Sequence, residues 1–127
     1  MMAKKSILMV DDDSRILALL EETLAHPELI LTKAQDALKA FILARNVPPL
    51  LIICDIQLPG YGDGMKMLKL LREDPRVPRV PFLFITGMDQ KKALALLPTN
   101  DHSIRLMSKP LDLTKLRDYV WRLAGVA

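Results

Sequence analysis

The stretch ILMVDDDSRI, residues 7–16, runs four apolar residues directly into three aspartates. A short, continuous apolar run is typical of a strand covered on both faces of a parallel sheet. Neighbouring carboxylates repel one another, and removing them from water is costly unless a cation compensates their charge. Either these aspartates lie in solvent, or a cation lies among them. Asp13 or Ser14 is expected to cap a following helix, since both residue types are favoured at helix N-caps.

Four further apolar runs have the character of strands: LLIIC at 50–54, FLFI at 82–85 and, more weakly, LILT at 29–32 and IRLM at 104–107. Apolar residues recur at helical spacing between these runs. The expected stripes are Ile16, Leu20 and Leu24; Leu38 and Ile42 with Ala34; Met65, Leu68 and Leu71; and Leu113, Leu116, Val120 and Leu123. A short helix is expected from Gln90 to Leu97, ended by Pro98.

Five strands that alternate with five helices indicate a doubly wound α/β domain, with a parallel sheet and helices on both faces. A chain of 127 residues can bury roughly two-thirds of its unfolded surface, so we expect one domain over residues 1–127. The single cysteine, Cys54, fits a reducing compartment and favours the cytoplasm. No apolar run reaches the roughly 20 residues of a membrane helix, so we expect a soluble protein without membrane contact.

The formal charge of +3 is unevenly distributed along the chain. Residues 1–85 contain 11 basic and 11 acidic side chains, whereas residues 86–127 contain 7 basic and 4 acidic ones. An excess this small, without aromatic residues among the bases, does not favour direct nucleic-acid binding. We interpret the basic residues as a solvated surface.

Polar residues follow four of the expected strands at the point where each strand ends. Asp11 and Asp12 follow the first run, Asp55 the third, Thr86 the fourth and Lys109 the fifth. Ligands of such sheets bind outside the carboxyl ends of the strands, so these side chains should converge. Carboxylate oxygens without nearby Cys or His ligands suit Mg²⁺, and a hydroxyl and an ammonium can hold the remaining oxygens of a phosphoryl group.

The segments ILMVDDD, IICDIQLPG, FLFITG and SKP, in this order, resemble the signature segments of the two-component response-regulator receiver domain. The resemblance covers essentially the whole chain and implies a flavodoxin-like fold with strand order 2-1-3-4-5. It also implies phosphoryl transfer from a histidine kinase or histidine phosphotransfer protein, with no enzymatic activity beyond Mg²⁺-dependent self-phosphorylation and dephosphorylation. The implied roles are Asp55 as phosphoacceptor, Asp12 and Asp55 as metal ligands, Asp11 as holder of a metal-bound water, the Gln57 carbonyl as a further ligand, and Thr86 and Lys109 as phosphoryl-binding groups.

The resemblance further implies an output face built from the fourth helix, fifth strand and fifth helix, which would bind a downstream protein or form a phosphorylation-dependent homodimer. Leu106 departs from the family's usual aromatic at that position, so we expect the segment starting at Gly87 to supply the conformational change instead. The partner is expected to carry an acidic patch that meets Lys91, Lys92, Arg105, Lys115 and Arg122. The loop LPGYGDG after Asp55 is one residue longer than the family pattern, which predicts an altered acceptor pocket.

Three other functions are compared with this one. A receiver-like docking module that never carries phosphate is disfavoured by the presence of Asp55, Thr86 and Lys109. A Mg²⁺-dependent phosphatase with an aspartate nucleophile, resembling the haloacid dehalogenases, would require an acid two residues after the nucleophile, where this chain has Gln57. Flavin binding is disfavoured because acids replace the phosphate-binding loop after the first strand.

Overall fold

A computed structural model describes residues 5–58 and 63–127 of the chain. The described residues form a five-stranded parallel sheet with the predicted strand order 2-1-3-4-5. The strands are β1 (Lys5–Val10), β2 (Leu29–Ala34), β3 (Leu51–Asp55), β4 (Phe82–Thr86) and β5 (Ile104–Ser108). The helices are α1 (Ser14–Leu24), α2 (Ala37–Asn46), α3 (Gly64–Glu73), α4 (Gln90–Leu96) and α5 (Leu113–Ala124).

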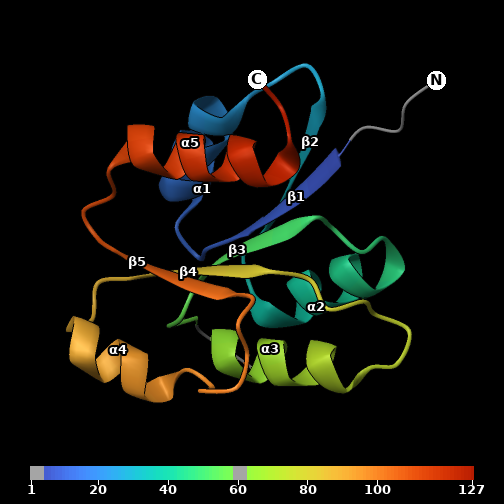
Figure 1. The fold of residues 1–127 in the computed structure, drawn as a ribbon, viewed down its shortest axis with the longest axis vertical. Coiled ribbons are helices and arrows are strands. Elements are labelled where there is room, and N and C mark those ends of the chain that lie inside the picture. Colours follow the sequence, from blue (N-terminus) through green and yellow to red (C-terminus); the bar gives the residue numbers. More distant parts are fainter. Residues whose placement is uncertain (1–4, 59–62) are drawn as a thin grey trace.

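The sheet lies between two layers of helices (Figure 1). Helices α2, α3 and α4 cover one face, and α1 and α5 cover the other. The continuous apolar run of β1 explains this arrangement, because alternate residues contribute to different cores. Leu8 and Val10 pack beneath α2 and α3, whereas Ile7 and Met9 pack beneath α1 and α5. A strand with no polar alternation is therefore the sequence signature of the central, doubly covered position.

An aspartate caps the N-terminus of each helix in the described part of the chain. The capping residues are Asp13, Asp36, Asp63, Asp89 and Asp112, and each carboxylate accepts a hydrogen bond from a backbone N–H in the first turn. These bonds satisfy donors that have no partner within the helix. The structure thus assigns Asp13 to the start of α1, with Ser14 as the first helical residue.

The predicted stripe of α2 was wrong. Leu38 and Ile42 are exposed, and Ala34 is the last residue of β2. The buried face of α2 consists of Ala37, Ala40 and Ala44, which belong to the core shared with α3. Small side chains allow this helix to lie close to the sheet, and its large apolar side chains therefore project outward.

The other stripes agree with the structure in part. Leu20, Leu24, Leu68, Leu71, Leu116 and Val120 are buried, while Ile16, Met65 and Leu113 are half-buried at the edges of their helices. Leu123 is exposed, and Ala124 takes the expected core position on α5. Helix α4 ends at Leu96, one residue before the predicted end.

Helix α3 is joined to the segment before β5 by a buried polar cluster. Arg72 donates from Nε to Asp101 Oδ2 at 2.8 Å and from Nη2 to Ser103 Oγ at 2.9 Å. Ser103 Oγ donates in turn to Asp101 Oδ1 at 2.6 Å. Burial acts to raise the pKa of Asp101, but the hydrogen bonds from Ser103 and Arg72 outweigh it and lower the pKa to about 2. The cluster is therefore ionised at neutral pH.

Within residues 5–58 and 63–127, no helix combines the length and the apolar character that crossing a bilayer would require.

Candidate functional site

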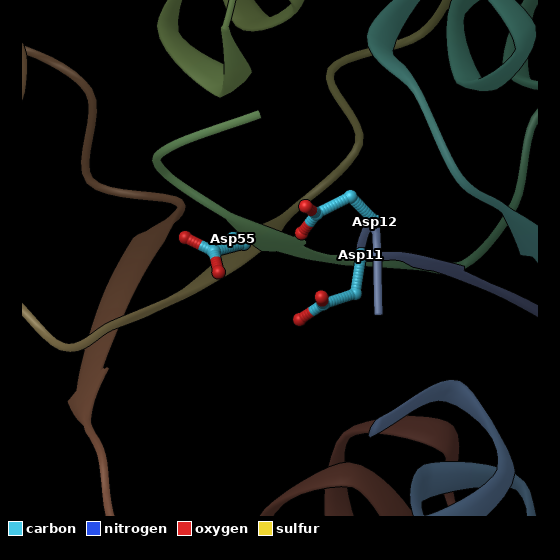
Figure 2. A group of neighbouring side chains, drawn as sticks. All are labelled: Asp11, Asp12 and Asp55. Atoms are coloured by element: carbon cyan, nitrogen blue, oxygen red, sulfur yellow. The ribbon is translucent and has the colours of Figure 1, made fainter. Parts of the chain in front are cut away.

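The carboxyl edge of the sheet gathers the polar residues that follow its strands. Asp11, Asp12 and Asp55 each offer a carboxylate oxygen, and these oxygens lie within 4.8 Å of one another. Figure 2 shows the carboxylates of Asp11 and Asp12 leaving the end of β1 toward the side on which Asp55 lies. Parallel pairing explains the convergence, because β1 and β3 are adjacent and both end at this edge. The predicted cluster of three acids is confirmed.

Lys109 brings a positive charge into this cluster from the end of β5. Its Nζ lies 2.9 Å from Asp55 Oδ2 and 3.9 Å from Asp11 Oδ2. Partial burial acts to lower the pKa of Lys109, but the hydrogen bond to Asp55 and the surrounding carboxylates outweigh it and raise the pKa. Lys109 is therefore a cation at neutral pH, and it partly neutralises the three acids.

Burial differs strongly among the three aspartates. Asp11 is 3% exposed, and its Oδ1 accepts a hydrogen bond from the backbone N of Asp13 at 2.9 Å. Burial is the main reason why the pKa of Asp11 is raised, and the charges of Asp55 and Asp12 add to it. Asp55 is 8% exposed, whereas Asp12 is exposed to solvent. The site is thus closed on its inner side and open at Asp12.

Thr86 is fully buried at the end of β4, the strand between β3 and β5. Its Oγ1 accepts a hydrogen bond from the backbone N of Met88 at 3.0 Å, and its backbone O accepts one from Lys109 N at 2.8 Å. The second bond fixes the chain that carries Lys109. Through these two hydrogen bonds, the buried Thr86 connects the loop between β4 and α4 with Lys109.

Gln57 also lies at this edge, where its backbone N donates to Asp55 Oδ1 at 2.9 Å. Its side chain is exposed. The lengthened loop LPGYGDG, predicted to alter the pocket, falls partly outside the described residues, because 59–62 are not among them.

Two neighbours of Asp55 were not singled out for this site by their sequence. Cys54 is fully buried, and its Sγ donates to the backbone O of Asp55 at 3.1 Å. Burial first, and the nearby Asp55 second, raise the pKa of the Cys54 thiol, which is therefore a small core residue. Gly64 opens α3 directly against the same backbone oxygen, so a Cβ built there would lie 2.8 Å from it.

The donor set fits a hard divalent cation. The cluster offers carboxylate oxygens from three residues, and the described residues around it provide no nearby sulfur or imidazole ligand except the buried, protonated Cys54. Mg²⁺ typically takes one or two carboxylates and keeps several waters, which matches a site that is open at Asp12. Asp11, Asp12 and Asp55 are the residues that would hold it.

The profile of the Response regulator receiver domain family matches residues 7–121. The chain belongs to this family. It is therefore a receiver domain of two-component response regulators.

Individual relatives agree with this assignment. The chain is 32% identical over 83 residues to the response regulator PleD of Caulobacter vibrioides, covering 65% of this chain and 18% of PleD. It is 29% identical over 119 residues to the response regulator protein PilR of Pseudomonas aeruginosa, covering 94% of this chain and 26% of PilR. The chain thus spans about a fifth to a quarter of the length of these two relatives.

A similar solved structure is the signal receiver domain of an HD domain-containing protein from Pseudomonas fluorescens. It superposes with a TM-score of 0.82 at 27% identity, covering 98% of this chain and 90% of that chain. The receiver fold predicted from the sequence is therefore confirmed by its strand order and by comparison.

The residues expected to form the output face lie on α4, on β5, on α5 and in the loop between β4 and α4. Lys115 and Arg122 of α5 are exposed. Gly87, Lys91, Lys92 and Arg105 are exposed. Leu106 is half-buried and packs against the core beneath α2, α3 and α4.

Proposed function

We propose that this receiver domain accepts a phosphoryl group on Asp55 from the phosphohistidine of a kinase or phosphotransfer protein. A carboxylate oxygen of Asp55 attacks phosphorus, the new O–P bond forms, and the P–N bond to the imidazole breaks with the imidazole as leaving group. The product is an acyl phosphate. We place this reaction in the cytoplasm, the compartment indicated by the single cysteine.

The chain's own residues have separate tasks in this reaction. The Nζ of Lys109 lies 2.9 Å from Asp55 Oδ2. After the transfer, it would bind an oxygen of the phosphoryl group and compensate its negative charge. Thr86 would donate its hydroxyl proton to another of these oxygens, while it keeps accepting from Met88 N. Asp11 and Asp12, with Asp55 and the Gln57 carbonyl, would hold Mg²⁺, which supplies the neutralising charge that phosphoryl transfer between anions requires.

The observation that carries this proposal is the environment of Asp55. The residue is 8% exposed, and its carboxylate lies within 4.8 Å of two further acids and contacts a lysine. A cluster of this kind favours a bound cation and an incoming anionic group, and it offers one carboxylate as the acceptor.

The proposal is tested by intact-mass measurement after treatment with acetyl phosphate. The native protein should gain the mass of one phosphoryl group in the presence of Mg²⁺ and none in the presence of EDTA. Asp55→Asn should remain unmodified under both conditions. Asp118→Asn, which changes an exposed acid on α5, serves as the matched control and should be labelled like the native protein. Equal labelling of Asp55→Asn would refute Asp55 as the acceptor.

Metal binding is tested separately by titrating Mg²⁺ while backbone NMR shifts are recorded. Saturable shifts at Asp11, Asp12 and Asp55 are expected, with a dissociation constant in the micromolar-to-millimolar range of a site with few protein ligands. Asp12→Ala should weaken binding, because it removes the solvent-facing carboxylate. Identical titrations of the two proteins would contradict the assignment.

We further propose that phosphorylation changes the face formed by α4, β5 and α5, and that the segment from Gly87 to Gln90 supplies the movement. Gly87 is exposed, and a Cβ there would meet no atom within 4 Å, so its backbone has room to move. The hydrogen bond between Thr86 Oγ1 and Met88 N connects this segment to the site. An acidic partner, or a second copy in a phosphorylation-dependent homodimer, would then meet the basic residues of this face: Lys91, Lys92, Arg105, Lys115 and Arg122.

Backbone NMR with and without beryllofluoride, a phosphoryl mimic, tests this movement. Shifts are expected at residues 87–107 in addition to those at the acid cluster. Shifts confined to the acid cluster would mean that the proposed switch does not exist.

A further inference from the structure

Residues 87–103, here called the α4 segment, contribute few buried side chains to the fold. Only two of them are buried, Ala93 and Asp101. Leu94 and Leu96 of α4 are 51% and 50% exposed. Because a helix as short as α4 is marginal by itself, its stability depends on these few contacts with the rest of the domain.

The packing of α4 against its neighbour α3 is incomplete. A hollow of about 370 Å³ lies between the two, and its lining includes Met65 and Leu68 of α3 and Leu96 and Pro98 of the α4 segment. Atoms that face each other across such a hollow gain little van der Waals attraction from one another. Apolar packing alone therefore does not fix α4 in its place.

Polar contacts hold the two ends of the α4 segment. At its start, the backbone N of Met88 donates to Thr86 Oγ1 at 3.0 Å. Near its end, the side chain of Asp101 is 4% exposed, and its Oδ2 lies 2.8 Å from Arg72 Nε and 3.3 Å from Arg79 Nη2. Arg72 belongs to α3 and Arg79 to the loop before β4, so these two ion pairs, here called the Asp101 anchor, join the segment to the rest of the domain.

We propose that the α4 segment opens and closes as one unit while the rest of the domain stays folded, and that the Asp101 anchor keeps it closed. Local opening of this kind is expected where a segment buries few apolar groups. Opening would separate α4 from α3 and break both ion pairs of Asp101, whereas the pairing of β1, β2 and β3 and the packing of α5 would be retained.

The opening would regulate one part of the proposed output face. Lys91 and Lys92 lie on α4 and hold their positions only while the segment is closed. A partner that binds the folded α4 would shift the equilibrium toward the closed state, and its apparent affinity would fall with the fraction of open molecules. This consequence rests on the proposed output face, whereas the opening itself is a property of the unphosphorylated domain.

Native-state hydrogen exchange, measured by NMR at pH 7 in low concentrations of urea, tests the opening. The backbone N of Ala93, which donates to Asp89 O, reports on α4 under conditions in which closing is faster than chemical exchange. Relative to its intrinsic rate, this amide should exchange roughly a hundredfold or more faster than the slowest amides of α5 and β3. Its exchange should also depend only weakly on urea, because a local opening exposes little surface.

Variants of buried acids test the Asp101 anchor. Asp101→Asn should accelerate exchange of the α4 amides roughly tenfold or more, because it removes the charge that both arginines hold. Asp74→Asn is the matched control, since the Asp74 side chain is 10% exposed and also pairs with two arginines, Arg45 and Arg76, but lies outside the α4 segment. This control should leave α4 exchange unchanged. Arg79→Gln alters a side chain that is 60% exposed, does not threaten folding, and should accelerate α4 exchange about two- to fivefold.

Three results would overturn the proposal. The first is exchange of the α4 amides only by global unfolding, with the same protection and the same urea dependence as α5. The second is α4 exchange that Asp101→Asn and Arg79→Gln leave unchanged, which would mean that the anchor does not control the opening. The third is equal acceleration of α4 exchange by Asp74→Asn. All measurements use the unphosphorylated protein, so failure of phosphorylation at Asp55 would not affect them.

Discussion

Gly64→Ala is expected to destabilise the protein and to disturb its acid cluster at the same time. A Cβ at this position would lie 2.8 Å from the backbone O of Asp55 and 3.1 Å from both Cys54 Sγ and Phe84 Cε1. These neighbours are fully buried or belong to the backbone, so none can rotate away into solvent. Either α3 or the end of β3 must move, and the end of β3 carries the carboxylate of Asp55.

The free energy of this change is the difference between two opposing effects. Overpacking a well-packed region typically costs about 1–3 kcal/mol. Replacing glycine by alanine restricts the unfolded chain and returns about 0.4–1 kcal/mol. We therefore expect a net loss of about 1–2 kcal/mol in the free energy of unfolding. For a chain of this length, the loss corresponds to a decrease in Tm of roughly 4–8 °C.

Urea denaturation monitored by circular dichroism measures the stability, and a Mg²⁺ titration monitored by NMR measures the effect on the acid cluster. Gly87→Ala is the matched stability control, because a Cβ there would meet nothing within 4 Å. Because nothing opposes the restriction of the unfolded chain there, the free energy of unfolding of this control should equal that of the native protein or exceed it by up to about 1 kcal/mol. A Gly64→Ala protein that is as stable as the native protein and binds Mg²⁺ equally well would refute the packing argument.

Asp101→Asn should lose about 2 kcal/mol of stability at pH 7, because the folded pKa of about 2 lies below the ordinary 3.8. This contribution is fully present above about pH 5 and is lost as the pH falls through 3.8 toward 2. The free energies of unfolding of the variant and the native protein should therefore converge at low pH, and a constant gap would contradict the argument. Lys109→Met should tighten Mg²⁺ binding several-fold, because it removes a cation that competes for Asp55. Weaker Mg²⁺ binding by this variant in the NMR titration would contradict the argument. Cys54 should react with iodoacetamide only after unfolding, since its thiol is fully buried and its pKa is raised; rapid alkylation of the folded protein, detected by mass, would disprove this.

The sequence was most informative where its pattern has one physical meaning. Short apolar runs without alternation that alternate with helical stripes are typical of covered parallel strands, and the acids and the lysine that follow such strands are expected to meet at one edge of the sheet. The positions of Asp11, Asp55 and Lys109 could therefore be predicted without knowing a single contact.

The failure at α2 has an equally specific cause. Periodicity identifies two different faces of a helix, but it does not decide which one is buried when one face holds alanines and the other leucine and isoleucine. The distance between the helix and the sheet decides it, and that distance depends on the packing of α3 beside α2. The contact of Gly64 with Asp55 and the pairing of Arg72 with Asp101 were missed for a related reason, since only the folded chain brings these residues together.

During translation, the acids of the cluster are synthesised before its cation, because Lys109 follows β5, the last strand of the sheet. Asp11 is synthesised 98 residues before Lys109, which at typical rates of synthesis corresponds to roughly 5–20 s. During this interval the nascent chain has its carboxylates but lacks the lysine that compensates them in the finished protein. A ribosome-bound chain that stops before β5 cannot complete the cluster. This edge of the sheet therefore acquires its compensating cation only after β5 has been synthesised.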